Sequence, residues 1–396
     1  MIAIPALPDV LDGLCQSEYP RFSDAEMQRR RGVIEEMLAR AGCEHLVFCG
    51  ANRFGSVVQW LTHWPVTAEA VGVMTPGLRD ALFVQYVNHA ELAGLIARDA
   101  DVAWGGPSSI QAAIDVLTQR KARPGSVAFI GPLNLRQHEA LSHACGKLQD
   151  LTPAYTRVRQ VKSDEELDWF RIGAYFADLG MAALRNNLRP GISEIELGAC
   201  IEQAYVSRGG GHVIHYVGVT AMDAPSVPVP RQFPSRRRVQ VGDAVSAEIS
   251  AAFWEHSGQV LRSFTLGQPP NSLYRDLHQA ADAAFDAICN VLRPGAMPAE
   301  VIEASSVIEA AGFTIIDDLL HGYGAGYLQP ILGSKSRPAG PIPEEPFRVG
   351  QTVVVQPNVV TRDRKAGVQM GEFLVITPSG VERLHRYPRG FETVAA

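Results

Sequence analysis

The sequence predicts an α/β domain followed by an α+β domain that contains an internal repeat. With 396 residues, the chain is too long for one ordinary hydrophobic core. Short apolar runs alternate with helical patterns through residues 1–160. Residues 161–396 instead group helices in pairs, followed by strands that Gly- and Pro-rich turns connect. We therefore expect two domains, 1–160 and 161–396.

The repeat in the second domain is centred on residues 241–248, which read Val-Gly-Asp-Ala-Val-Ser-Ala-Glu. Residues 349–356 read Val-Gly-Gln-Thr-Val-Val-Val-Gln and likewise pass from a turn into an apolar strand that ends on a polar side chain. The sequence Leu-Arg-Pro-Gly recurs at nearly the same offset, at residues 188–191 and 292–295. If the two copies pack about a pseudo-twofold axis, Glu248 and Gln356 face each other across one cleft, where we expect the chemistry.

Capping signals and apolar runs predict the individual elements. In the first domain, a capping box at residues 23–26 starts a helix that Gly42 ends. Further strands are predicted at residues 45–49, 81–87 and 126–130, helices at 89–97 and 135–145, and a crossing segment at 154–161. In the second domain, capping boxes start helices at residues 163 and 193, and more helices are predicted at 272–292 and 298–311. We expect two helix pairs that back a strongly curved sheet.

The charge balance and the cysteines indicate a soluble protein of the reducing cytoplasm. The chain has 36 basic and 42 acidic residues and a net charge of −6, and no basic tract dominates, so we exclude nucleic acid as a partner. No apolar run approaches the length of a membrane span, and the N-terminus lacks a signal-peptide pattern. The six cysteines lack the paired spacing of a disulfide framework or a zinc site.

Glu248 and His321 are the residues that we expect to carry the chemistry. A carboxylate such as Glu248 in an apolar strand costs several kcal/mol unless it is paired or functional. It would act as a nucleophile or general base, and the alternative is a structural ion pair with Arg262. His321 precedes residues 322–324 (Gly-Tyr-Gly), where the backbone can approach a ligand and the imidazole can shuttle a proton. The alternative for His321 is a core histidine bonded to a carbonyl.

Other side chains are candidates for substrate binding. His212 and His215 lie three positions apart in a predicted strand, so they should point to opposite faces of the sheet. We favour His212 for the cleft because it approximates the repeat partner of His321. Arg262 is expected to pair with a carboxylate, and Tyr323 to line the mouth of the cleft.

The second domain resembles the pita-bread fold of prolidase, aminopeptidase P, methionine aminopeptidase and creatinase. The resemblance rests on Lys-Ser-Asp-Glu-Glu at residues 162–166, on Arg-Pro-Gly at 189–191, and on the order Gly242-Asp243, His321-Gly322 and Gln356-Pro357. The two-domain layout resembles the creatinase and aminopeptidase P branch and implies a homodimer. In creatinase-like dimers the N-terminal domain reaches the neighbouring subunit's cleft, a role that the resemblance assigns here to Arg53 and Trp60.

The resemblance also implies where metal ligands would lie. The metallopeptidases of this family hold two divalent ions with two aspartates, one histidine and two glutamates. In this sequence the corresponding positions are Glu248, Gln259, His321, Gln356 and Gly371. Two hard cations need bridging carboxylates, which one glutamate and two neutral amides do not supply. We therefore expect no metal and no other cofactor, and we expect Gln259 and Gln356 to hold a polar substrate.

Creatinase implies, by resemblance, that this fold can hydrolyse a C–N bond without metal. Its catalytic histidine corresponds to Arg231 here and its second-strand glutamate to Leu261, which argues against creatine as the substrate. Glu372 follows the position of the missing ligand, and it would face the cleft only if Gly371 permits a bulge.

The sequence thus predicts a metal-independent hydrolase that cleaves an amide, lactam or amidine C–N bond in a small polar molecule. Glu248 and His321 would be catalytic. The predicted substrate-binding residues are Gln259, Gln356, His212, Tyr323, Arg262 and Glu372. Two alternatives stay open: an inactive pseudo-peptidase that binds a ligand or partner, and a C–N or C–S lyase that uses the same cleft.

Overall fold

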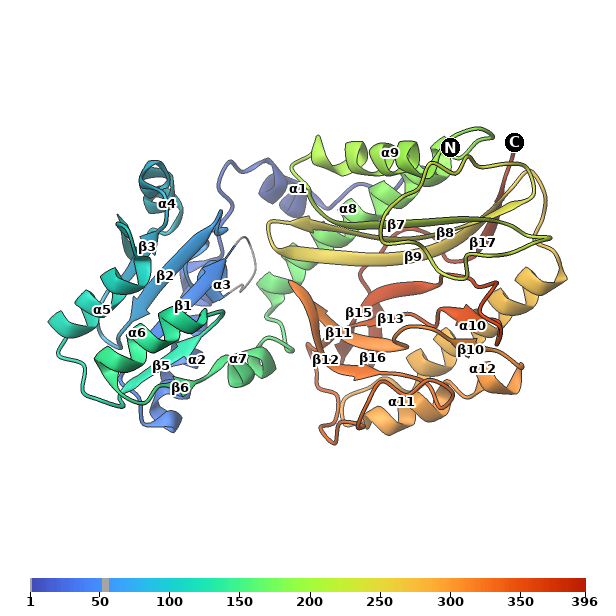
Figure 1. The fold of residues 1–396 in the computed structure, drawn as a ribbon. Helices are drawn as coiled ribbons and strands as arrows, with labels where there is room; N and C mark the ends of the chain where they lie inside the picture. Colours follow the sequence, from blue (N-terminus) through green and yellow to red (C-terminus); the bar gives the residue numbers. More distant parts are fainter. Residues whose placement is uncertain (1, 52–56) are drawn as a thin grey trace. The chain divides into compact units, whose positions relative to one another are not determined.

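The structure, a computed structural model, describes residues 2–51 and 57–396, which form two compact units (Figure 1). One unit is Glu18–Arg159, and the other joins the chain up to Ser17 to Gln160–Ala396. The N-terminal residues therefore belong with the larger unit, which differs from the predicted division at residues 160 and 161. They are tied there by hydrogen bonds, because the amide of Ile2 donates to Oδ1 of Asn186 across 2.9 Å.

The Glu18–Arg159 unit is built on a six-stranded mixed sheet with the order β4-β3-β2-β1-β5-β6. Its strands are β1 (His45–Ala51), β2 (Glu69–Met74), β3 (Asp80–Val84), β4 (Ala100–Trp104), β5 (Val127–Ile130) and β6 (Gln149–Asp150). Its helices are α2 (Asp24–Ala41), α3 (Val57–Thr62), α4 (Ala90–Ile96), α5 (Ser109–Gln119), α6 (Leu135–Cys145) and α7 (Thr152–Val158). The predicted α/β character is confirmed. The sequence analysis did not identify β2, β4 or α5, and most of the expected crossing segment is the helix α7.

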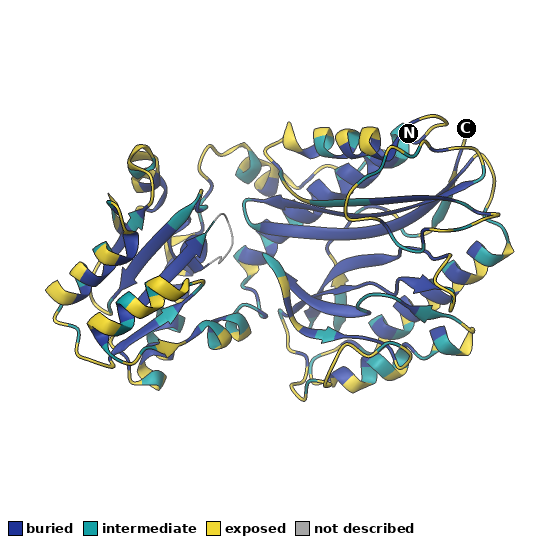
Figure 2. Cartoon of the chain, in the orientation of Figure 1, coloured by how far each residue is buried: buried dark blue, intermediate teal, exposed yellow. Residues whose placement is uncertain are grey.

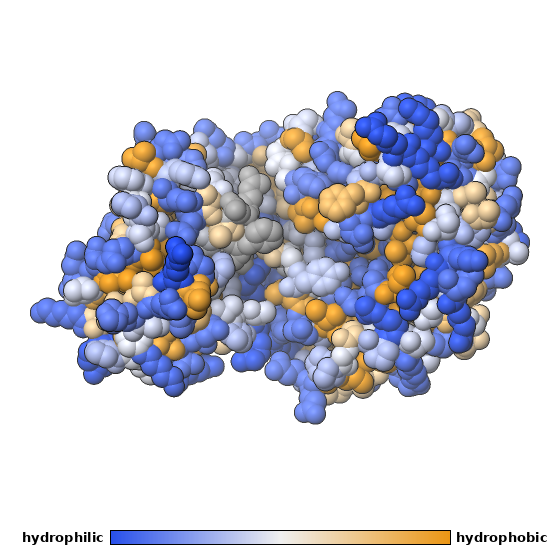
Figure 3. Space-filling view, viewed as in Figure 1, coloured by the Kyte–Doolittle hydropathy of each residue, from blue (hydrophilic) through white to orange (hydrophobic). Residues whose placement is uncertain are grey.

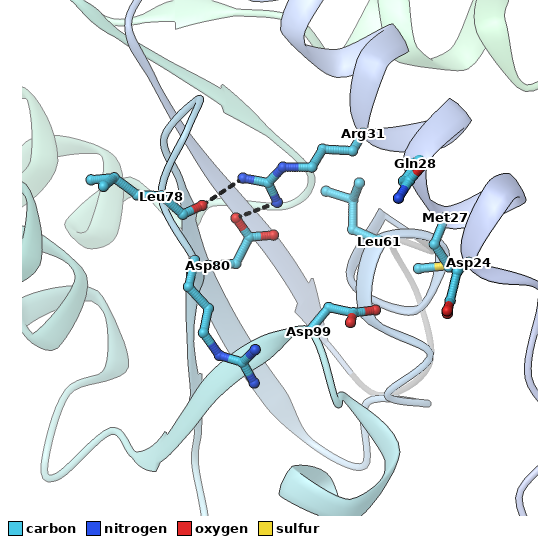
Figure 4. Close-up of a pocket in the computed structure, with 9 residues that line it drawn as sticks. Asp24, Met27, Gln28, Arg31, Leu61, Leu78, Asp80 and Asp99 are labelled. Carbon is cyan, nitrogen blue, oxygen red and sulfur yellow. Dashed lines mark hydrogen bonds and ion pairs between the residues drawn. The ribbon is translucent and has the colours of Figure 1, made fainter.

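A pocket of about 390 Å³ lies in this smaller unit (Figure 4). Charged side chains in its lining are already paired: Arg31 donates to Oδ1 of Asp80 across 2.8 Å and to the carbonyl oxygen of Leu78 across 2.8 Å. Asp99 pairs with Arg21. The pocket lining is thus part of the ion-pair network that holds this unit together.

The larger unit contains a nine-stranded sheet in which seven strands run in the order β12-β11-β13-β15-β9-β8-β7, while β16 pairs with β15 and β17 with β9. The strands are β7 (Gly211–Ala221), β8 (Asp243–Phe253), β9 (His256–Leu266), β11 (Leu320–Gly324), β12 (Gly326–Leu332), β13 (Thr352–Val355), β15 (Gly371–Thr377), β16 (Gly380–Arg383) and β17 (Phe391–Val394). Strands β10 (Thr314–Ile315) and β14 (Val359–Val360) form a separate small sheet. Figure 1 shows helices along opposite sides of this unit with the strands between them.

The helices of the larger unit reproduce the predicted repeat. They are α1 (Asp9–Gln16), α8 (Asp164–Asn187), α9 (Glu194–Val206), α10 (Ser272–Val291), α11 (Pro298–Ala304) and α12 (Val307–Ala310). The capping boxes of Ser163 and Ser193 are both formed. Gly191 and Gly295 follow α8 and α10 with φ of 85° and 86°, a left-handed conformation that favours glycine and turns the chain into the next helix. The helix predicted at 298–311 is interrupted, because α11 ends at Ala304 and α12 starts at Val307.

The core of this unit explains why the central strands are apolar. Every residue of β8 and β9 is buried (Figure 2). Helix α8 packs on these strands, and Leu277 and Phe285 of α10 belong to the same buried hydrophobic cluster as Val353 and Leu374. A polar side chain in β8 or β9 therefore sits in a low-dielectric setting that shifts its ionisation.

On the face shown in Figure 3, hydrophobic residues lie in small groups among predominantly hydrophilic ones. None of the helices in the described part of the chain has the length and apolar character needed to cross a membrane.

Candidate active site

Strand register places Glu248 and Gln259 on the same face of the nine-stranded sheet, which we call the inner face. Directly paired residues share a face, and successive residues of a strand alternate between faces. Glu248 pairs with Leu261 of β9, and Ser250 pairs with Gln259. Because Glu248 and Ser250 are two positions apart, the side chains of all four residues lie on the inner face.

The same reasoning carries the inner face across the sheet to His321. Leu261 pairs with Gly371 of β15, and Phe373, two positions further, pairs with Val354 of β13. Val354 in turn pairs with His321 of β11. His321 therefore shares the inner face with Glu248, as do Tyr323 and Gln356, which lie two positions from His321 and Val354. The structure thus brings together the five inner-face residues Glu248, Gln259, His321, Tyr323 and Gln356.

Glu248 is a buried carboxylate with an unusual proton affinity. It is 8% exposed, and Nε2 of Gln259 donates a hydrogen bond to its Oε1 across 2.5 Å. Burial and the nearby carboxylate of Asp317 raise the pKa of Glu248 to about 8, although the hydrogen bond from Gln259 opposes this shift. At neutral pH the side chain of Glu248 is therefore mostly a protonated acid. Arg262, the ion-pair partner considered in the sequence analysis, instead pairs with Glu372.

A chain of amides continues from Glu248. Nε2 of Gln259 lies 3.5 Å from Oε1 of Gln356, and Nε2 of Gln356 donates to the carbonyl oxygen of Asp318 across 3.3 Å. The Oε1 atom of Gln259 is buried and has no hydrogen-bond partner in the described part of the chain. Since a buried amide oxygen costs free energy when it is unpaired, this atom is available to accept a hydrogen bond from a bound molecule.

Asp317 is a functional candidate that the sequence analysis missed. Burial and Asp318 raise the pKa of Asp317 to about 7, although hydrogen bonds from Asn358 favour its ionised form. Nδ2 of Asn358 donates to both carboxylate oxygens, across 3.2 and 3.1 Å. The one available signal was the acidic pair Asp317-Asp318 close before His321, which is weak because such pairs are usually solvated.

His321 is a neutral imidazole, and one of its ring nitrogens can accept a proton. It is 0% exposed, and burial lowers its pKa to about 4. Its Nδ1 lies 3.0 Å from the carbonyl oxygen of Gly322, so in the neutral ring Nδ1–H donates to that oxygen. Among the described residues its buried Nε2 makes no hydrogen bond, although the nearby side chain of Gln356 favours the protonated ring, so the Nε2 lone pair can accept a proton. His321 thus lies on the same face as Glu248, and it also makes the hydrogen bond to a carbonyl that the alternative interpretation expected. Its catalytic role stays a prediction.

Two tyrosines flank His321, one of them missed in the sequence. The Tyr327 ring stacks on the imidazole with centroids 3.7 Å apart, although the residue itself is 52% exposed. Tyr323, expected at the mouth of a cleft, is instead 3% exposed. Its hydroxyl is held by the side chains of Ser250 and Ser257 across 3.2 and 3.1 Å. Tyr323 therefore braces the inner face, and Tyr327 covers the histidine from solvent.

Arg262 and Glu372 lie on the opposite, outer face, so their positions do not support the predicted contact with substrate. Arg262 pairs with Ala247, the neighbour of Glu248, and Glu372 pairs with Val260. The two side chains form a buried ion pair, and Arg383 also donates to Glu372 across 2.6 Å. Gly371 introduces no bulge, so period-two alternation turns Glu372 away. The expectation that Arg262 pairs with a carboxylate is confirmed.

His212 also lies on the outer face, and the prediction that His212 and His215 point to opposite faces is wrong. The register of β7 shifts between His212 and Ile214 because a bulge inserts Val213. His212 therefore pairs with Ala251 and His215 with Ile249, which share one face. Both imidazoles point toward Glu202 of α9, at 3.8 and 3.0 Å between the Nδ1 atoms and Oε1.

The residues assigned to a neighbouring subunit's site give little support to that role. Arg53 lies outside the described residues. Trp60 is 6% exposed, and its ring packs edge-on against Tyr155 of the same unit with centroids 5.5 Å apart. Its assignment to a partner's site stays a prediction.

The inner-face donors do not fit a pair of divalent ions. Glu248 is the one carboxylate among the five positions that the family resemblance identified, and its Oε1 already accepts from Gln259. Position 371 is closed, since a Cβ on Gly371 would lie 2.8 Å from Cδ1 of Leu261 and 2.9 Å from Cβ of Gln356. Among residues 2–51 and 57–396, one group of three or more His, Cys, Asp or Glu side chains brings its ligand atoms within 4.8 Å of one another, and it lies on the outer face.

Comparisons with known proteins agree with this architecture. The chain is 22% identical over 394 residues to a creatinase from Bacillus sp., which covers 94% of this chain and 93% of the relative. It is 26% identical over 265 residues to a probable dipeptidase PepE from Mycobacterium tuberculosis, covering 63% and 64% of the two chains. The X-Pro aminopeptidase from Thermotoga maritima has the same fold, with a TM-score of 0.79, 15% identity, and coverage of 93% of this chain and 99% of that one.

The model of metallopeptidase family M24 matches residues 168–378, which include both halves of the repeat and every inner-face residue described above. This match spans more than half of the chain, and the relatives carry the same fold beyond it. The chain therefore belongs to the M24 family, with the pita-bread fold that the family resemblance implied.

Proposed function

We propose that this chain is a metal-independent hydrolase that cleaves an amide, lactam or amidine C–N bond in a small polar molecule. The observation that carries the proposal is the opposite displacement of two inner-face pKa values. Glu248 is protonated up to about pH 8, and His321 is neutral down to about pH 4. An acid and a base that are both in their working states at neutral pH are the requirement for general acid–base hydrolysis.

The chemical step follows from these protonation states. Nε2 of His321 accepts a proton from water while the water oxygen forms a bond to the carbonyl or amidine carbon. Glu248 donates its proton to the departing nitrogen as the C–N bond breaks. The proton on His321 then returns to Glu248, directly or through the product, and restores both groups. Glu248 thus serves as the acid, rather than as the base or nucleophile that the sequence suggested.

The two glutamines position the substrate in this scheme. The unpaired Oε1 of Gln259 accepts a hydrogen bond from an N–H group of the substrate. Gln356 lies beside it and offers both a donor and an acceptor. This polarity favours a small zwitterionic or cationic molecule over an apolar one.

The names of the relatives support a hydrolase, and the bond that is cleaved is inferred from the residues of the inner face. They carry the names hydrolase/peptidase, dipeptidase and creatinase. A peptide bond is itself an amide C–N bond, so dipeptides belong among the compounds to be tested. The proposal departs from the peptidases because the inner-face donor set does not fit their two ions.

The test is a hydrolysis screen with chelator-treated protein. Amides, lactams, amidines, guanidino compounds and dipeptides are incubated with the chain, and release of ammonia or amine is measured alongside the mass gain of one water. We expect turnover that Glu248→Gln and His321→Asn reduce by about 10²-fold or more. The matched controls are Glu345→Gln and His143→Asn, two exposed positions that should retain wild-type activity.

Two outcomes would overturn the proposal. Activity that appears only after addition of Mn²⁺ or Co²⁺, with two ions bound per chain, would return the chain to the metallopeptidase mechanism. The second outcome is a compound that raises the melting temperature of the wild type and is not turned over. If the Glu248→Gln variant no longer binds that compound, the chain is a ligand-binding pseudo-enzyme.

A further inference from the structure

We propose that the outer face of the larger unit carries a binding site for one divalent transition-metal ion of the zinc class, formed by Glu202, His212 and His215. This site is separate from the inner face. It depends neither on the proposed hydrolase activity nor on the positions of the family's metal ligands. Two imidazoles and one carboxylate are a donor set that zinc uses when three protein groups leave a fourth position open.

The distances from Oε1 of Glu202 to the two imidazoles are close to those between ligands of one bound ion. Zn–N and Zn–O bonds of about 2.0–2.2 Å place the ligand atoms of a tetrahedral ion about 3.4 Å apart. Nδ1 of His215 lies 3.0 Å from Oε1 of Glu202, and Nδ1 of His212 lies 3.8 Å from the same oxygen. These separations bracket the required value. All three ligand atoms lie within 4.8 Å of one another, so side-chain rotations of the partly exposed His212 and Glu202 would complete the site.

The backbone brings the two histidines to one face. Because the bulge at Val213 adds one residue to β7, His212 and His215 oppose residues of β8 that are two positions apart. His212 and His215 consequently face the same side of β7, with ring centroids 4.8 Å apart. Gly198 of α9 lies beneath the His215 ring, and a Cβ there would sit 3.0 Å from its Nε2. A glycine at this position leaves space for the imidazole beside the helix that supplies Glu202.

The two histidines differ in how readily they could bind an ion. Nδ1 of His215 is buried and forms no hydrogen bond with the residues that the structure describes, although it lies 3.0 Å from Oε1 of Glu202. Nδ1 of His212 lies 3.1 Å from the hydroxyl of Tyr205, which the ion would displace from that nitrogen. The side chains of His212 and Glu202 are 44% and 43% exposed, so an ion reaches them directly from solvent.

The donor types select among cations. Imidazole nitrogen favours zinc and neighbouring transition ions, whereas calcium and magnesium prefer sets of oxygen ligands. Bound metal would connect α9 to β7, which is the edge strand of the nine-stranded sheet. We therefore expect the ion to stabilise the folded chain, because it binds the assembled cluster and not the separated residues.

The test is a zinc titration of the full chain without a histidine tag, after chelator treatment and desalting. Competition against a chromophoric chelator at pH 7.5 should give one tight site per chain, and zinc should raise the melting temperature while magnesium should not. Cobalt(II) should give the intense visible absorption of a tetrahedral ion. Glu202→Gln, His212→Ala and His215→Ala should each weaken zinc binding about tenfold or more.

The control variants separate this site from every other histidine. His138→Ala removes an exposed histidine of the smaller unit, and His321→Asn removes the inner-face histidine. Both should bind zinc as the wild type does. Retention of wild-type zinc affinity in all three cluster variants would overturn the proposal, as would loss of the site in His321→Asn. If His215→Ala does not fold, Glu202→Gln decides, because its side chain is partly exposed and isosteric with the original.

Discussion

The side-chain amide of Gln259 donates a hydrogen bond across 2.5 Å to the carboxyl group of Glu248 on the adjacent strand β8. This bond alone would favour an ionised carboxylate. Burial and Asp317 outweigh it and raise the pKa of Glu248 to about 8. The fold therefore holds a proton on Glu248 that the unfolded chain releases near pH 4.5, and this difference has measurable consequences.

Replacement of Glu248 by Gln should flatten the dependence of stability on pH. Between about pH 4.5 and 8 the native wild-type protein binds a proton that the unfolded state does not, so its free energy of unfolding falls as the pH rises. The free energy of unfolding of the wild type should therefore fall, relative to that of Glu248→Gln, by a few kcal/mol between pH 5 and pH 8.5. Urea unfolding at pH 5, 6.5 and 8.5 measures it. The free energy of unfolding of Glu345→Gln should depend on pH as that of the wild type does. The same pH dependence in Glu248→Gln would contradict the raised pKa of Glu248.

The proposed roles also fix the shape of the pH–rate profile. kcat/KM should rise as His321 loses its proton near pH 4 and fall as Glu248 loses its proton near pH 8. Glu248→Gln should lower the rate and remove the alkaline limb, while the acidic limb remains. Measurement over pH 3.5–9.5 with any substrate from the screen tests this. A rate that increases through pH 8 would show that the Glu248 carboxylate acts as base or nucleophile.

Glu372→Gln should destabilise the protein without changing substrate affinity. The variant leaves Arg262, which is 1% exposed, with carbonyl oxygens but no countercharge, a loss of about 3–5 kcal/mol. KM should stay at the wild-type value because both residues lie on the outer face. The matched control is Glu382→Gln, whose half-exposed pair with Arg171 should contribute less than about 1 kcal/mol. A raised KM with unchanged stability would restore Glu372 to substrate binding.

Gly371→Ala should also destabilise the fold, here through steric overlap. Its Cβ would meet Leu261 and Gln356 at less than 3.0 Å, which should cost about 1–3 kcal/mol in urea unfolding. A second substitution, Leu261→Ala, should recover part of the loss contributed by the Leu261 contact. Gly32→Ala, in a helix where nothing lies within 4 Å of the added methyl group, should be neutral or stabilising. Equal effects at positions 371 and 32 would contradict the closed site.

Local chemistry explains how much of the fold could be predicted. The Ser163 and Ser193 capping boxes act over four residues and form as expected. The turns at Gly191 and Gly295 depend on backbone preferences of single residues and take the same conformation in both halves of the repeat. The strand that contains Glu248 was predicted from its apolar residues, although β8 continues past the expected end at Glu248 to Phe253. These features need no knowledge of distant partners.

The remaining site features depend on partners that the sequence does not reveal. The Val213 bulge reverses the facing of His212, and no residue at that position marks a bulge in advance. Asp317 acquires its raised pKa from burial, which is a property of the assembled unit. The acid role of Glu248 likewise appears only when its desolvation is known. The sequence pattern identified most of these residues. The sheet face toward which each side chain points, and its protonation state, depend on tertiary contacts.

The two outer strands of the nine-stranded sheet also determine how copies of the chain could associate. Strand β7 lies at one end of the sheet and carries the Val213 bulge, and β12 lies at the other end and contains Pro330, which has no amide hydrogen to donate. Neither strand offers the uninterrupted ladder on which another polypeptide could extend the sheet. Extension of the sheet from these two end strands is therefore disfavoured, so we expect the predicted homodimer to form through other surfaces of the chain.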